Sequence, residues 1–182
     1  MILQIKGIAH KEIYMKKIIL GLLVSLLVLG CSGNENQLNA VPVEAKLVIN
    51  KSLSNLTLND QFGKAHTLSS DTKTVIFAFS KDMGHLCNDF FVTQDIKYLE
   101  NNQAIFVADV SAAPSIIRSM FIMPGLKDFD HRVLVLDNED TASSYKEGLD
   151  AEKIVVVNLD NNIITNITTA NSINELRAII EK

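Results

Sequence analysis

The sequence predicts an α/β fold, a three-layer α/β/α domain with a mixed central sheet and an N-terminal β-hairpin. Three short, continuous apolar runs carry this prediction, because strands buried on both faces lack the alternation of half-exposed strands. They are residues 74–79, 104–108 and 133–136. Segments with helical periodicity separate the runs, and a hairpin pattern lies at each end. This order predicts helices on both faces of the sheet.

The first half of the domain begins with the hairpin. Residues 56–58 and 65–68 alternate apolar and polar side chains, and the turn-rich segment Asn59-Asp60-Gln61-Phe62-Gly63-Lys64 joins them. A helical stretch follows the first apolar run and extends to about Leu99, where Asn101-Asn102 stops it. The next apolar run is then expected to lie beside the first, with this helix packed on one face.

A second helix is predicted between the next two apolar runs. Ser111 is its expected cap, Pro114 lies in its first turn, and Pro124-Gly125 is expected to end it. Its apolar side comprises Ile116, Ile117, Met120 and Phe121. We expect this side to face the sheet.

The C-terminal part predicts a second hairpin and a last helix. Residues 154–157 and 163–165 flank the turn Asp160-Asn161-Asn162. Residues 172–175, Ser-Ile-Asn-Glu, form a capping box, and the buried stripe that follows is Leu176, Ile179 and Ile180. Residues 75–79, 105–107, 133–136 and 154–157 are expected to be neighbouring strands of one central sheet.

A secretory signal precedes the domain. Lys16 and Lys17 are followed by an apolar run, residues 18–29, and by Gly30-Cys31. The stretch resembles bacterial lipoprotein signal peptides, whose cysteine is acylated and becomes the mature N-terminus. A transmembrane anchor or a buried helix is the alternative, but the run is short for about 30 Å of hydrocarbon. Residues 1–30 are therefore interpreted as a signal peptide, with 1–14 an over-extended start.

Processing at Cys31 would leave a lipidated cysteine and flexible tether over residues 31–51 and a domain over 52–182. The mature chain would carry 13 basic and 20 acidic residues, a balance that argues against nucleic acid as a partner. Cys87 would be the one remaining free thiol, so no intramolecular disulfide forms. The predicted location is the bacterial cell envelope, with the domain facing the periplasm. Because Ser32 stands where an aspartate favours inner-membrane retention in enterobacteria, the outer membrane is favoured by analogy.

The order of elements, with the opening at residues 56–68, resembles the thioredoxin fold in its thiol-disulfide and peroxiredoxin-like branches. The second half is similar to the YtfJ-like periplasmic proteins, which lack a CxxC motif and have no defined activity. Its matching stretches are residues 129–138, 144–149 and 154–162. The resemblance covers about residues 52–182 and implies a thioredoxin-like fold more than a reaction.

The candidate chemistry lies after the first apolar run, where thioredoxins carry their two cysteines. Counted from Phe79, Gly84 takes the place of the attacking cysteine and Cys87 that of the resolving one, so a dithiol cycle lacks one sulfur. Counted from Phe77, Asp82 and Cys87 match the spacing of a peroxidatic loop, but Ser80 and Gly84 replace its proline and threonine. A thiol near a helix N-terminus still has one route to reactivity, a lowered pKa.

Two hypotheses follow. The first is a redox-degenerate domain with a binding or accessory role and a possible envelope protein partner. In it Cys87 packs in the core with Met83, Phe90 and Phe91. The second is a Cys87-dependent thiol peroxidase or thiol-disulfide oxidoreductase.

Metal and cofactor signals are weak. His85 and Asp89 lie four residues apart and lack a third ligand, so no metal site is predicted, and no cofactor motif is present. Residues 137–140, Asp-Asn-Glu-Asp, are interpreted as a solvated acidic turn.

Membrane attachment through Cys31 is directly testable. We expect Cys31→Ala to release the protein from the membrane fraction or to leave it unprocessed, because the acylated sulfur is lost. Fractionation with immunoblotting of the processed and unprocessed forms checks this. A mutant that matures and fractionates like wild type would contradict the lipoprotein interpretation.

Overall fold

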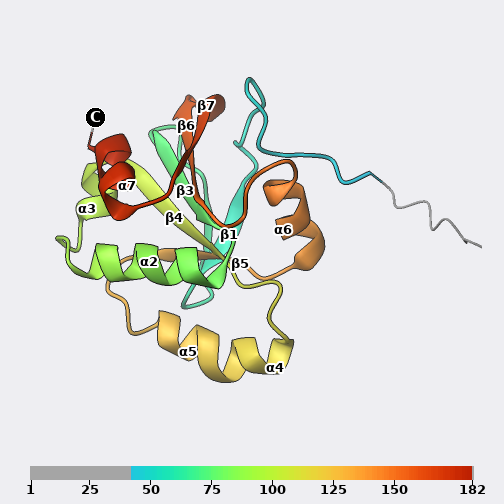
Figure 1. The fold of residues 1–182 in the computed structure, drawn as a ribbon, viewed down its shortest axis with the longest axis vertical. Coiled ribbons are helices and arrows are strands. Elements are labelled where there is room, and N and C mark those ends of the chain that lie inside the picture. The colour runs from blue at the N-terminus through green and yellow to red at the C-terminus, as the bar shows by residue number, and fades with distance from the viewer. Residues whose placement is uncertain (1–41, 182) are drawn as a thin grey trace, which may run out of the picture. The chain divides into compact units, whose positions relative to one another are not determined.

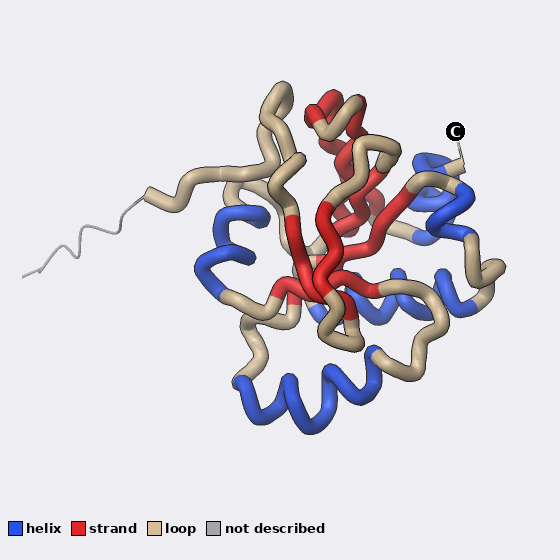
Figure 2. The backbone as a smooth tube through the Cα atoms, turned by 180° about the vertical axis from the view of Figure 1, so that it is seen from behind, coloured by secondary structure: helices blue, strands red, loops and turns tan. Residues whose placement is uncertain are grey.

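The computed structural model describes residues 42–181, which form a seven-stranded mixed sheet with helices on both faces (Figures 1 and 2). The strand order is β2-β1-β5-β4-β3-β6-β7. The parallel strands β3, β4 and β5 form the centre, and the antiparallel pairs β1–β2 and β6–β7 flank them. The predicted α/β fold class, the N-terminal hairpin and the neighbouring central strands are confirmed.

The strands follow the expected segments closely. Their bounds are β1 Thr57–Asp60, β2 Ala65–Thr67, β3 Thr74–Ala78, β4 Ala104–Asp109, β5 Val133–Leu136, β6 Ile154–Asp160 and β7 Ile163–Ala170. All five residues of β3 and all four of β5 are buried, which explains their unbroken apolar sequences. β6 and β7 are longer than the predicted hairpin strands. Several positions of β7 are exposed, and Thr and Asn side chains occupy them, so the strand continues without an apolar sequence.

The helices cover both faces of this sheet. Their bounds are α2 Lys81–Val92, α3 Tyr98–Asn101, α4 Ser115–Ile117, η1 Arg118–Ile122 (a π-helical turn), α5 Met123–Leu126, α6 Glu139–Lys146 and α7 Ile173–Ile180. α2 and α7 pack on one face, visible in front of the strands in Figure 1. α6 packs on the opposite face through Ala142 and Tyr145. No helix within residues 42–181 is long and apolar enough to cross a membrane.

The capping box at α7 forms, with one change of partner. The backbone N–H of Glu175 donates to Ser172 Oγ at 3.3 Å, as predicted. The Glu175 carboxylate accepts from the backbone N–H of Asn171 at 2.8 Å, one residue earlier than expected. The hydrogen bond from the Asn171 backbone N–H, followed by the one from the Asn171 side chain, lowers the pKa of the Glu175 carboxyl.

The helix that was expected to be capped by Ser111 differs from the prediction in where it starts, where it ends and which side is exposed. It begins at Ser115 after Pro114, while the backbone N–H of Ser111 donates to Asp109 Oδ1 at 2.8 Å. Pro124 and Gly125 lie inside α5 instead of ending the helix. Because Pro124 has no N–H to donate and its ring crowds the carbonyl one turn back, the preceding turn widens to the π-helix η1. The predicted apolar side is exposed to solvent.

Two further expectations about local structure are wrong. The first helix ends at Val92, and the separate short helix α3 carries Leu99. Residues 137–140 are not a solvated turn, because Asn138 caps α6 by accepting from the backbone N–H of Thr141 at 2.9 Å. Glu139 and Asp140 then occupy the first turn of α6, where acidic side chains complement the helix dipole.

The packed domain begins before the predicted boundary at Ser52. Leu47 is buried in the same apolar cluster as Leu53 and Leu56. The backbone N–H of Lys46 donates to Ser144 O in α6 at 2.9 Å. Residues 46–51 are therefore part of the domain and not of a tether. The predictions for residues 1–41, including Cys31, lie outside the described residues.

The β6–β7 turn requires left-handed backbone at two positions. Asn161 has φ 49° and Asn162 has φ 64°, a conformation that asparagine adopts more readily than other non-glycine residues. The side chain of Asn161 is exposed, so the backbone effect can be isolated at this position.

We expect Asn161→Val to lower the free energy of unfolding by roughly 1–2 kcal/mol, because a β-branched side chain is strained at positive φ. Asn161→Gly is the matched control and should change it by less than about 0.5 kcal/mol. Urea unfolding followed by circular dichroism measures both. Equal stability of the two variants would contradict the strained-turn explanation.

Candidate functional site

Cys87, the predicted reactive residue, lies on the buried side of α2. It is the seventh residue of this helix and has an exposed fraction of 0%. It belongs to the apolar cluster that joins α2, α7 and the sheet, with Phe90 and Phe91 from the same helix. Cys87 is thus two turns away from the helix N-terminus that could have activated it.

The surroundings of Cys87 oppose thiolate formation. Burial raises the pKa of its thiol to about 12. It is the only free thiol in residues 42–181. The structure therefore presents Cys87 as a core side chain whose reactive form is strongly disfavoured near neutral pH.

The residues predicted to flank the thiol do not join it. Asp82 and His85 are exposed, as is Asp89, and all three lie on the outer side of α2. Gly84 has no atom within 4 Å of the position that a Cβ would take, so it does not serve a close approach. Among the described residues, no group of three potential metal ligands comes together.

A buried polar cluster lies on the same face as Cys87 and was not predicted. His131 Nε2 donates to Asn88 Oδ1 at 2.9 Å, and Gln61 Nε2 donates to the His131 carbonyl at 2.9 Å. Gln61 Oε1 accepts from the backbone N–H of Val133 at 3.0 Å. The Gln61 side chain thereby extends the β1–β5 pairing past the last residue of β1. In the sequence, the one indication of this buried cluster was Asn88, a polar residue on the apolar arc of a predicted helix.

His131 is enclosed by aromatic rings. Its ring stacks on Phe129 with centroids 5.2 Å apart, and Phe91 meets it edge-on at 5.3 Å. Burial lowers the pKa of His131 to about 4, against a smaller opposing effect of Asp130. Its imidazole is neutral at neutral pH, and its Nε2 proton is committed to Asn88.

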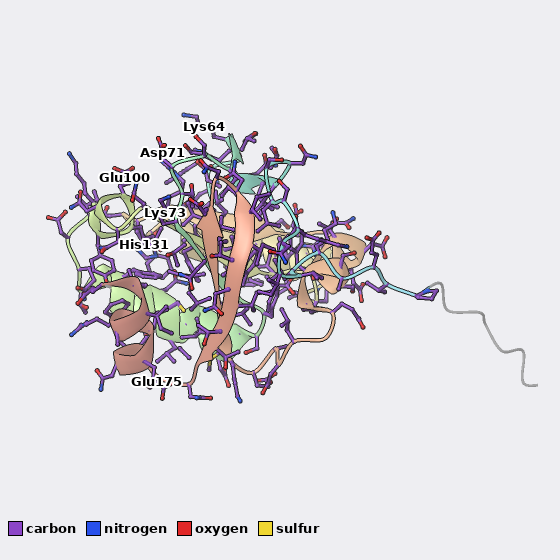
Figure 3. All side chains as sticks on the ribbon, turned by 90° about the horizontal axis from the view of Figure 1, so that it is seen from above. Lys64, Asp71, Lys73, Glu100, His131 and Glu175 are labelled. Carbon is purple, nitrogen blue, oxygen red and sulfur yellow. The ribbon has the colours of Figure 1, made fainter. Side chains whose placement is uncertain are left out.

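A cavity of about 400 Å³ adjoins this cluster between β1, α3 and the first residues of β4 and β5. Figure 3 shows His131 toward the interior and Glu100 of α3 near the surface. At its outer side, Arg132 lies 3.6 Å from the Glu100 carboxylate. The cavity is at the opposite end of the parallel strands from Ser80, where the predicted thiol site begins.

Asp60 at this cavity has a structural role. Its carboxylate accepts from His66 at 2.7 Å and from the backbone N–H groups of Phe62 and Lys64, each at 2.9 Å. Burial alone would raise the pKa of Asp60, but these hydrogen bonds outweigh it and hold the pKa below its usual value. These bonds fix the β1–β2 turn, so the Asp60 carboxylate is engaged in structural contacts.

Comparison with known proteins agrees with the fold and adds no activity. No protein-family model matches the sequence, and no curated protein matches it. Solved structures with a similar arrangement include peroxidoxin BcpB from Mycobacterium tuberculosis (15% identity, 73% of this chain and 96% of that one, TM-score 0.46). The mitochondrial 2-Cys peroxiredoxin of Plasmodium falciparum is similar at 15% identity (74% and 92%, TM-score 0.46). The thioredoxin domain of a thiol-disulfide oxidoreductase from Bacteroides vulgatus is similar at 12% identity (74% and 99%, TM-score 0.45).

The described residues form an α/β fold with a mixed seven-stranded sheet. The hairpin, the βαβαβ unit, the second hairpin and the last helix follow one another along the chain in the predicted order, and the strands lie in the sheet in the order β2-β1-β5-β4-β3-β6-β7. At these identities and TM-scores, no activity of the similar structures is transferred to this chain.

The buried His131 makes stability depend on pH. Because its folded-state pKa is about 4 and its unfolded value is 6.5, the unfolded chain binds the extra proton between these values. The contribution of the neutral His131 ring to the free energy of unfolding is fully present above pH 6.5. It is lost as the pH falls toward 4, and the loss amounts to at most about 3 kcal/mol.

We expect His131→Gln to flatten the pH dependence of the unfolding free energy between pH 6.5 and 4.5, even though it lowers stability overall. His85→Gln, at an exposed site of α2, is the control and should keep the wild-type slope. Urea unfolding at several pH values measures this. An unchanged slope in His131→Gln would show that His131 is not the group responsible.

Proposed function

We propose that this protein is a lipid-anchored cell-envelope protein whose thioredoxin-like domain has a binding or accessory role and no thiol redox activity. The observation that carries the proposal is the burial of Cys87. Its exposed fraction is 0% and its pKa is raised to about 12. A nucleophilic thiol needs a populated thiolate and access to its substrate, and this site provides neither.

The residues around the start of α2 support the same conclusion. In a dithiol mechanism a second sulfur resolves the mixed disulfide, and this chain has Gly84 at the corresponding place. Asp82 and His85 point away from Cys87 on the outer side of α2, so neither assists its deprotonation. The sequence similarity to YtfJ-like periplasmic proteins, which also lack the motif, is in keeping with a domain that retains the fold without the chemistry.

The location in this proposal rests on the sequence before the described residues. The basic pair Lys16-Lys17, the apolar run 18–29 and Cys31 support export and acylation. Acyl chains, and not protein charge, would hold an acidic chain at the membrane. The proposed location is the periplasmic side of the envelope, with the outer membrane favoured because Ser32 follows the cysteine. A second envelope protein is the proposed kind of partner, and nucleic acid is not.

Removing the thiol tests the function directly. We expect wild type and Cys87→Ser to consume peroxide and to reduce insulin disulfides only at the background rate. Cys87→Ser should lower the free energy of unfolding by roughly 1–2 kcal/mol, because a hydroxyl replaces a thiol in an apolar site. Cys87→Ala is the packing control for the stability measurement.

Alkylation provides an independent measure of access. With the protein folded at neutral pH, iodoacetamide should modify Cys87 far more slowly than in the urea-unfolded chain. Peroxide consumption by wild type that Cys87→Ser abolishes would identify Cys87 as a catalytic nucleophile. That result would establish the thiol peroxidase alternative in place of the proposed function.

A further inference from the structure

The helical run α4–η1–α5 exposes apolar side chains on its outer side. Ile116 is 62% exposed, Ile117 41%, Met120 60% and Phe121 64%. We refer to these four residues as the outer apolar face. A contiguous set of large exposed side chains on one helical run differs from single exposed residues, which are common on any protein surface.

The inner side of the same run is also apolar. Ile122, Met123 and Leu126 contact the cluster beneath α2, and they attach the run to the domain. A helix that is apolar on all sides is normally buried on all sides. The outer apolar face therefore has the composition of a surface that is covered in the working protein.

The position of this run relative to the start of the described chain, near Lys46, indicates which surface covers it. The backbone N–H of Lys46, near the start of the described residues, donates to the carbonyl of Ser144 in α6. Lys146 of the same helix lies 3.3 Å from Asp109, the last residue of β4. Asp109 accepts from the Ser111 N–H, and the Ser111 carbonyl accepts from Arg118 Nη1 at 2.9 Å. Figures 1 and 2 show α6, the incoming chain and the α4 end of the run on one side of the domain.

The length of chain before Lys46 brings a lipid surface within reach. The 15 residues from Cys31 to Ala45 span at most about 50 Å when fully extended. A domain of this size has a radius of gyration of about 14 Å, so its diameter is smaller than that reach. If Cys31 is acylated as proposed, the outer apolar face lies within reach of the bilayer.

The charge of the segment also fits a lipid surface. The run itself, residues 115–126, contains Arg118 and no acidic residue, and Lys127 and Asp128 follow it directly. The chain from Cys31 onward, in contrast, has seven more acidic than basic residues. Basic residues beside an apolar face are the usual composition of helices that lie in the interface of membranes with anionic lipids.

From this position, exposure and charge, we propose that the outer apolar face inserts into the surface of the bilayer to which the chain is anchored. The inference rests on the proposed lipid anchor at Cys31. Insertion would fix the orientation of the domain on the membrane.

The test uses the absence of tryptophan from the chain. The full chain would be isolated from the membrane fraction and reconstituted into phosphatidylethanolamine and phosphatidylglycerol vesicles, with or without brominated acyl chains. We expect Phe121→Trp to show blue-shifted emission and about twofold or stronger quenching by the brominated lipid, because its ring would lie at the headgroup and acyl boundary. Adding Met120→Ser and Ile117→Ser should abolish that quenching.

Phe62→Trp is the matched control. Phe62 is the same residue type with an almost equal exposed fraction, 65%, on the β1–β2 turn. Its emission should remain that of a water-exposed tryptophan and show no quenching by brominated lipid. Equal quenching of the two reporters would mean that the domain contacts lipid without a preferred face, which would overturn the inference.

The remaining outcomes separate this inference from the proposed function. Absence of quenching at Phe121→Trp overturns membrane insertion, while flotation with the vesicles and an acylated mass for Cys31 would still support the anchor. A mass without acyl chains refutes the anchor itself and removes the basis of the inference. Shielding of Phe121→Trp from acrylamide without lipid quenching also overturns it. Shielding that depends on protein density would indicate a second copy, and shielding that requires envelope extract would indicate a protein partner.

Discussion

Burial of the central strands on both faces is the constraint on which the rest of the structure depends. All five residues of β3 are buried, with Ile76 and Ala78 in the cluster under α2 and α7, and Val75 and Phe77 in the cluster under α6. Because successive side chains of a strand point to opposite faces, both faces need a covering layer. The N-terminal segment contributes to one of them through Leu47.

This covering layer determines the environment of the only described thiol. α2 must turn its apolar arc to the sheet, and Cys87 lies on that arc beside Phe90 and Phe91. The same rotation exposes Asp82 and His85. A cysteine in the first turn of α2 would lie near the positive end of the helix dipole and near solvent, and both favour the thiolate. That turn, residues 81–84, contains no cysteine.

The run α4–η1–α5 is the exception to complete coverage. α2 and α7 already cover their face of the sheet, so the run contacts this layer only through the side chains of η1 and α5. Pro124 within the run widens the preceding turn, and apolar residues remain on the outer side. The sequence predicted an apolar side for this helix correctly. Which surface that side meets depends on the space left by the other helices.

The sequence by itself determined the order of the strands, the buried central strands and the last helix cap, because these depend on local periodicity and on side chains a few residues apart. Only the tertiary structure decided the burial of Cys87, the exposure of Phe121 and the cluster of Gln61, Asn88 and His131. His131 lies 43 residues from Asn88 and 70 from Gln61, and their hydrogen bonds form only when β1, α2 and the start of β5 meet. Local patterns identify an apolar or polar face, whereas packing among distant segments decides what that face contacts.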